Sequence, residues 1–182
     1  MTQRKLFSQG DLDGACFLYT LANAVVALTG ANLKDRWPGA IQQVPKPEVF
    51  LRFDVGTAAF EDDFSTLLPV AESFVSAICR DVSVEIVSGV DRRRLSQIAD
   101  GDTVLAMCNP EHWFAIVEAD EKHAWVACSA RLLECGADYR EFNSPRWKRP
   151  SNHKVAIEDL AVYRRTVFRL HRSLVSGVVP RK

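Results

Sequence analysis

The chain has 182 residues, of which 47% are hydrophobic and 25% charged. This length and composition predict a single globular domain, residues 1–182, that buries a core without disulfides or metal ions. Basic and acidic residues number 23 each, and the resulting net charge of zero argues against nucleic acid or an anionic membrane as the main partner.

The N-terminal sequence and the cysteine spacing indicate the cellular compartment and whether disulfides or metal sites are expected. Residues 1–6 lack the apolar core of a signal peptide, and no apolar run approaches the roughly 20 residues that span a bilayer. We therefore expect a cytoplasmic protein with no membrane association. The five cysteines form no CxxC pair, so the sequence predicts no disulfide framework, no metal site and no cofactor. Cys79 and Cys108 are interpreted as small buried hydrophobic residues.

Helical patterns occupy the first half of the chain. Residues 15–29 are apolar nearly all round and end at Gly30, which predicts a buried central helix capped by glycine. Residues 31–56 are rich in Pro and Gly and predict irregular structure, with a short strand or turn at 49–53. A second helix is expected over about 61–80, and Pro69 either starts its main body or kinks it.

Strand patterns dominate the second half. The predicted elements there are a strand at 82–87, a short helix at 91–99 capped by Asp91, a strand at 103–108, a hairpin of 113–119 and 123–129, a polar loop at 139–153, a helix at 157–163 and a strand at 166–171. Helices that precede strands in this way predict the α+β class.

A candidate nucleophile stands where the first helix begins. Gln9 and Gly10 lead into Gly14-Ala15-Cys16, and the helical run starts at the cysteine. A helix N-terminus lowers the pKa of a thiol toward the reactive thiolate. Backbone N–H groups at such a turn, together with the Gln9 amide, can hold a developing oxyanion. Cys16 is therefore the candidate nucleophile and Gln9 the candidate oxyanion donor.

His112 is the candidate base among the four histidines. It directly precedes the apolar strand at 113–117, a position that fixes a ring at the edge of a sheet, facing a helix packed on that sheet. The alternative is a hydrogen-bonded histidine at a strand end. His123, His153 and His171 lie at a hairpin edge, in a polar loop and in a basic terminal strand, and receive no role.

Together these two segments resemble the papain-like cysteine peptidase superfamily, in particular compact bacterial members such as the leader-peptidase domains of bacteriocin exporters. Asp13-Gly14-x-Cys16 is also similar to the ovarian-tumour deubiquitinases of the same superfamily. The resemblance implies an α+β fold in which an N-terminal central helix carrying Cys16 packs on a C-terminal antiparallel β-sheet carrying His112. It implies Cys16 as nucleophile, His112 as general base and acid, and Gln9 as side-chain oxyanion donor.

The residue that orients the histidine departs from the family pattern. Papain-like enzymes place an Asp or Asn about sixteen residues after the histidine, whereas this chain has Cys128 and Ser129 at sixteen and seventeen. These two are the candidate orienters. Asp13 either caps the helix or lies beside the catalytic ring, and Trp113 is either a core aromatic or a wall that shields the site.

The expected function is hydrolysis of a peptide, isopeptide or other amide bond in a peptide or protein substrate, through an acyl-enzyme on Cys16. Two alternatives remain open: a papain-fold interaction module with reduced or no catalysis, and an acyltransferase or deamidase on the same fold. The sequence names neither the substrate nor the oligomeric state.

Overall fold

The computed structural model describes residues 5–9, 14–52, 54–60, 63–110, 112–130 and 140–173. Its α-helices are α1 (Cys16–Thr29), α2 (Trp37–Ile41), α3 (Pro47–Phe50), α4 (Leu68–Ile78) and α5 (Leu95–Ile98). Its 3-10 helices are η1 (Gly56–Phe60), η2 (Phe64–Leu67), η3 (Arg92–Arg94), η5 (Ile157–Asp159) and η6 (Tyr163–Arg165). Its strands are β1 (Val82–Ser88), β2 (Thr103–Cys108), β3 (Trp113–Ala119), β4 (His123–Cys128), β5 (Phe142–Asn143), β6 (Pro150–Ser151), β7 (His153–Ala156) and β8 (Thr166–Arg172).

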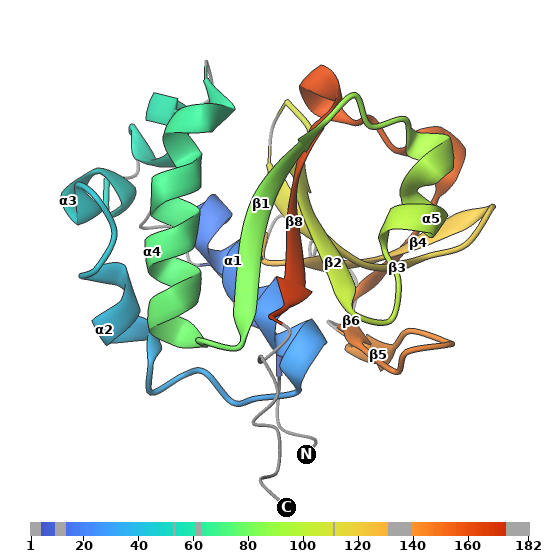
Figure 1. The fold of residues 1–182 in the computed structure, drawn as a ribbon, viewed down its shortest axis with the longest axis horizontal. Coiled ribbons are helices and arrows are strands. Elements are labelled where there is room, and N and C mark those ends of the chain that lie inside the picture. The colour runs from blue at the N-terminus through green and yellow to red at the C-terminus, as the bar shows by residue number, and fades with distance from the viewer. Residues whose placement is uncertain are drawn as a thin grey trace, which may run out of the picture.

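The centre of the molecule is an antiparallel six-stranded sheet in the order β1-β8-β2-β3-β4-β7 (Figure 1). The last strand, β8, lies between β1 and β2 and pairs with both. The two strands β5 and β6 form a separate small sheet. Helices precede most of the strands along the chain, so the predicted α+β class is confirmed.

The large sheet is covered on both faces. Trp113, Ala115 and Val117 of β3 join a core cluster with α1 and α4, while Phe114 and Ile116 join a second cluster with α5 and the segment after β7. Figure 1 shows α1 and α4 on one side of the sheet and α5 on the other. Burial of both faces explains why β2, β3 and β4 are apolar almost without alternation.

The first helix matches its prediction closely. Eleven of its fourteen residues are buried, since it packs against the sheet and against α4. It ends at Gly30, which adopts the left-handed conformation (φ 70°) and donates its N–H to the Val26 carbonyl. Pro69 stands in the first turn of α4, where its missing N–H costs nothing.

Two predicted elements are wrong. Residues 49 and 50, expected in a short strand or turn, belong to α3, because Pro47 in the first turn starts a helix there. The helix expected over 157–163 is reduced to the short η5, followed by a separate η6. The region predicted as one helix over 61–80 contains η2 and then α4.

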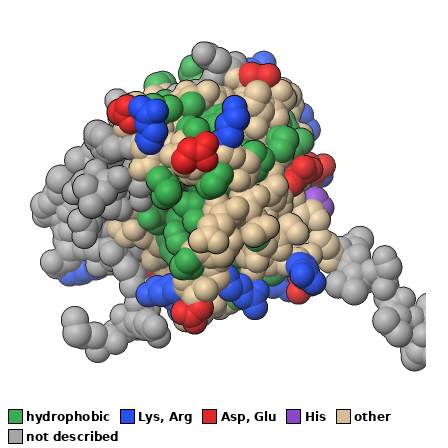
Figure 2. All heavy atoms as spheres, turned by 90° about the vertical axis from the view of Figure 1, so that its left-hand side faces the viewer, with side chains coloured by type: hydrophobic (Ala, Val, Ile, Leu, Met, Phe, Trp, Pro, Cys, Tyr) green, Lys and Arg blue, Asp and Glu red, His purple; other side chains and the backbone are tan. Residues whose placement is uncertain are grey.

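The outer surface over the helices carries charges of both signs, spread around apolar side chains (Figure 2). This distribution agrees with the zero net charge of the whole chain. Among the described residues, no helix combines the length and the apolar character needed to cross a membrane.

Candidate active site

Cys16 is the first residue of α1, and the start of this helix is capped from elsewhere in the chain. Ala15, in the N-cap position, provides no side-chain cap. Instead the hydroxyl of Thr57, from η1, accepts a hydrogen bond from the Phe17 N–H at 3.4 Å. The same oxygen accepts from the Cys16 thiol at 3.5 Å. Thr57 therefore supplies both the helix cap and a partner for the candidate nucleophile.

The direction of these hydrogen bonds matters for the thiol. The single hydroxyl proton of Thr57 is donated to the Gly14 carbonyl at 2.8 Å, so the oxygen presents only lone pairs to Cys16 Sγ. Lone pairs accept a proton from an S–H group and oppose a thiolate. In this arrangement Thr57 stabilises the neutral thiol.

A close backbone approach between Gly14 and Gly56 brings Thr57 into place. A Cβ on Gly14 would lie 2.4 Å from the Gly56 Cα, and Gly56 itself has φ +48°. The Thr57 N–H donates to the Gly14 carbonyl at 2.8 Å across this contact. Glycine at position 14 is thus required by the packing of η1 against the turn before α1.

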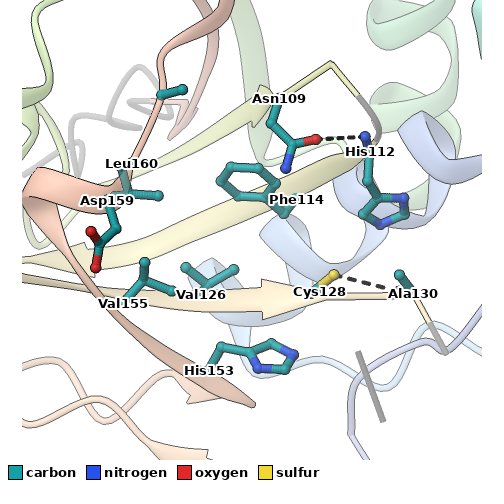
Figure 3. Close-up of a pocket in the computed structure, with 11 residues that line it drawn as sticks. Asn109, His112, Phe114, Val126, Cys128, Ala130, His153, Val155, Asp159 and Leu160 are labelled. Carbon is teal, nitrogen blue, oxygen red and sulfur yellow. Dashed lines mark hydrogen bonds between the residues drawn. The ribbon is translucent and has the colours of Figure 1, made fainter. Parts of the chain in front are cut away.

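His112 is held by a turn between β2 and β3. Its backbone N–H donates to Asn109 Oδ1 at 2.7 Å, and the Asn109 N–H donates to the His112 carbonyl at 3.0 Å (Figure 3). Burial lowers the pKa of His112 to about 4. The ring is therefore a neutral imidazole at neutral pH, able to accept a proton but not to act as a permanent cation.

The ring nitrogen Nε2 of His112 lies 3.5 Å from the Ser129 hydroxyl. Ser129 is buried at the end of β4, and its carbonyl accepts the Gln9 backbone N–H at 2.9 Å. Gln9, Ser129 and His112 are thus brought together, although the contact of Gln9 runs through its backbone. The role of its side chain as an oxyanion donor stays a prediction.

Cys128, the other candidate orienter, is directed elsewhere. Its side chain belongs to the second core cluster, and its sulfur accepts the Ala130 N–H at 3.4 Å (Figure 3). Asn152 clamps its backbone, accepting the Cys128 N–H and donating to the Cys128 carbonyl, both at 2.8 Å. Of the two candidates, Ser129 is the one whose side chain contacts the His112 ring.

Aromatic packing joins the start of α1 to the start of β3. The rings of Phe17 and Trp113 meet edge to face, with centroids 4.7 Å apart. Trp113 is fully buried and takes part in the core as an aromatic residue. Cys16 and His112 each immediately precede one of these rings in the chain, so the contact brings the start of α1 and the start of β3 together.

The thiol and the imidazole are not hydrogen-bonded to each other. Within the described residues, the Cys16 thiol contacts Thr57 and the His112 ring contacts Ser129. The His112 ring also borders a pocket on the sheet face opposite α1. Direct proton transfer between Cys16 and His112 therefore requires a shift of the ring or of the thiol, as is common in sites without substrate.

Asp13 lies outside the described residues, as does Gly10. Glu118, the buried carboxylate of β3, accepts the backbone N–H groups of Arg146 and Trp147 at 3.0 and 2.9 Å. Glu118 therefore stabilises the loop that precedes β6.

Sequence reasoning missed three residues that shape the site: Thr57, Asn109 and Asn152. Asn109 stands three residues before His112, and an Asn at that spacing is a recognisable turn signal. Thr57 and Asn152 act over 41 and 24 residues of sequence, and no local pattern indicates such contacts.

Comparisons of the chain with protein-family models, with curated proteins and with solved structures found no match.

Proposed function

We propose that this protein is a thiol hydrolase of the papain-like type, acting on a peptide, isopeptide or other amide bond. The observation that supports this most is the Phe17–Trp113 contact, since it sets Cys16 at a helix start beside the strand that begins after His112. A further supporting observation is the Ser129 hydroxyl, which lies 3.5 Å from Nε2 of the His112 ring.

In the proposed reaction, neutral His112 accepts the thiol proton as Cys16 Sγ attacks the substrate carbonyl. The Cys16 backbone N–H and the Gln9 side-chain amide bind the oxyanion of the tetrahedral intermediate. His112 then returns the proton to the leaving amine. Water, deprotonated by His112, attacks the thioester and releases the acyl group, so that the thiol is restored.

Ser129 acts in this proposal as a positioning residue. Its hydroxyl can accept a hydrogen bond from an imidazole N–H and so select the tautomer whose other nitrogen accepts the thiol proton. It stabilises imidazolium less than a carboxylate does. The chemistry therefore favours proton transfer during attack over a preformed thiolate–imidazolium pair.

An acyl-enzyme capture experiment tests the proposal. The chain is incubated with p-nitrophenyl acetate, and the acetylated cysteine is located by peptide mass spectrometry. We expect acetylation at Cys16 that decays with time, and its loss in Cys16→Ala. Cys79→Ala is the matched control, because Cys79 is also a partly exposed free cysteine. Acetylation that is equal at Cys16 and Cys79 contradicts the proposal.

A second candidate is an interaction module on the same fold with reduced catalysis. It is favoured by the Thr57 hydroxyl, which stabilises the neutral thiol, and by a serine in place of an orienting carboxylate. Under this candidate, no acyl-enzyme accumulates at Cys16.

A further inference from the structure

A pocket of about 470 Å³ lies on the sheet face opposite α1 and α4. Its lining comes from the neighbouring strands β3, β4 and β7, and from residues 159–161 that follow them. Figure 3 shows His112 and Asp159 on opposite sides of the lining residues, with Phe114, Val126 and Val155 between them. The candidate base thus borders both the proposed active site and a cavity.

The walls of this pocket are mainly apolar. Phe114, Val126 and Leu160 are buried parts of the second core cluster, and Val155 packs against the same cluster. Its polar residues are Asn109 and His112 at one end, His153 on β7, and Asp159 on the side opposite His112 (Figure 3). Since burial keeps the His112 imidazole uncharged at neutral pH, the end at His112 offers hydrogen bonds without a positive charge to pair with an anion.

The volume of the pocket falls in the range of small-molecule sites. A cavity of about 150 Å³ is enough for a benzene molecule, and small-molecule sites usually span roughly 300 to 1,000 Å³. A volume of about 470 Å³ therefore accommodates an apolar group larger than one aromatic ring.

We propose that this pocket binds the apolar acyl group of an uncharged amide or ester whose carbonyl lies at His112. The inference rests on the proposed function, because it assigns the acyl part of the substrate to a cavity that shares His112 with the catalytic pair. Apolar walls favour an apolar chain, and the neutral imidazole and the nearby Asn109 suit an uncharged carbonyl group.

A chain-length series tests this binding without turnover. The Cys16→Ala variant is titrated by isothermal calorimetry with N-acetyl-, N-butanoyl-, N-hexanoyl- and N-octanoylglycinamide. We expect the affinity to rise about fourfold for each methylene that enters the pocket, until the pocket is filled. Affinities that agree within about twofold across the series overturn the proposal.

The site of binding is tested by two matched substitutions. Val155 on β7 and Val87 on β1 are both half-buried, both lie on edge strands of the sheet, and both pack against the second core cluster. Val155→Trp fills the pocket and should abolish the chain-length dependence, whereas Val87→Trp should retain it. If Val155→Trp does not fold, Val155→Thr should still weaken octanoyl binding severalfold. Unchanged octanoyl binding in the folded Val155 variant overturns the assignment.

The two proposals fail separately. If binding depends on chain length but Cys16 is not acetylated, the hydrolase proposal is wrong and the assignment of the pocket stands. If Cys16 is acetylated but binding does not depend on chain length, the assignment of the pocket is wrong and the hydrolase proposal stands.

Discussion

Thr57 contacts the candidate nucleophile through one hydroxyl group. It donates to the Gly14 carbonyl and accepts from the Phe17 N–H and the Cys16 thiol. This hydroxyl group stabilises the fold because it caps the helix, and it lowers the reactivity of Cys16 because it opposes thiolate formation. Thr57 is thus a positioning residue whose two effects are separable.

Replacement of Thr57 by valine should lower the free energy of unfolding by roughly 1 to 3 kcal/mol, because buried hydrogen-bonding groups of the helix start lose their partner. It should also raise the rate of Cys16 alkylation severalfold, because the lone pairs that oppose the thiolate are removed. Urea denaturation and iodoacetamide labelling measure the two effects. Thr66→Val, at an exposed threonine of η2, should change neither, and slower labelling of Thr57→Val would show that Thr57 supports the thiolate.

The buried His112 makes stability depend on pH. Its folded-state pKa of about 4 lies below the ordinary value of 6.5, so the unfolded chain binds the proton more readily. Stability is fully present above pH 6.5 and falls as the pH drops from 6.5 to about 4. A shift of this size corresponds to a loss on the order of 3 kcal/mol.

Urea denaturation of the native chain and of His112→Gln at several pH values between 7 and 4 checks this linkage. The variant should lose much less stability over that range than the native chain. His123→Gln is the control, because His123 is more exposed, with 36% of its side chain accessible beside Asp120. Equal slopes for the native chain and His112→Gln would contradict the burial of a neutral imidazole.

At the scale of elements, α1 and η1 form one unit around the Gly14–Gly56 contact. Gly14→Ala should destabilise the fold by roughly 1 to 3 kcal/mol, because the new Cβ meets the Gly56 backbone at 2.4 Å. Gly39→Ala is the matched control, since nothing lies within 4 Å of a Cβ there. Chemical denaturation of both variants decides the matter, and equal stabilities would mean that the close approach is absent.

Local sequence predicts well those elements that have a clear hydrophobic pattern or a helix-capping residue. The all-apolar run of α1 with Gly30, the cap of Asp91 on Arg93 N–H, and strands β1 to β4 follow from such patterns. Residues 49 and 50 lie in a helix rather than in the expected strand or turn, because Pro47 in the first turn starts α3. Short runs of this kind are decided by their flanking residues.

At the scale of the whole molecule, the insertion of β8 between β1 and β2 creates the sheet that supports the site. Local patterns predict β8 as a strand but not its place, because its pairing with β1 joins residues some 80 positions apart, such as Ile86 and Phe168. The same limit applies to the site: Cys16, His112 and Ser129 follow from motif and spacing, whereas Thr57 becomes visible only when η1 packs on Gly14.

This arrangement makes the two faces of the sheet serve different parts of one proposed function. The face toward α1 positions Cys16, and the opposite face contains the pocket that His112 borders. The connection between them is the start of β3, where Trp113 belongs to the core beside α1 and the preceding His112 borders the pocket. Coupling of nucleophile and pocket therefore depends on the packing of Trp113 against Phe17.

The most direct test is the alkylation rate of Cys16 relative to Cys79 with iodoacetamide at pH 6, in the native chain and in His112→Gln. Both thiols are partly exposed, so exposure alone predicts similar rates. We predict severalfold faster labelling of Cys16, because neutral His112 accepts the thiol proton as the sulfur attacks the reagent, and a loss of this advantage in the variant. Slow, equal labelling of both cysteines, unchanged by His112→Gln, would contradict a Cys16 nucleophile with His112 as its base.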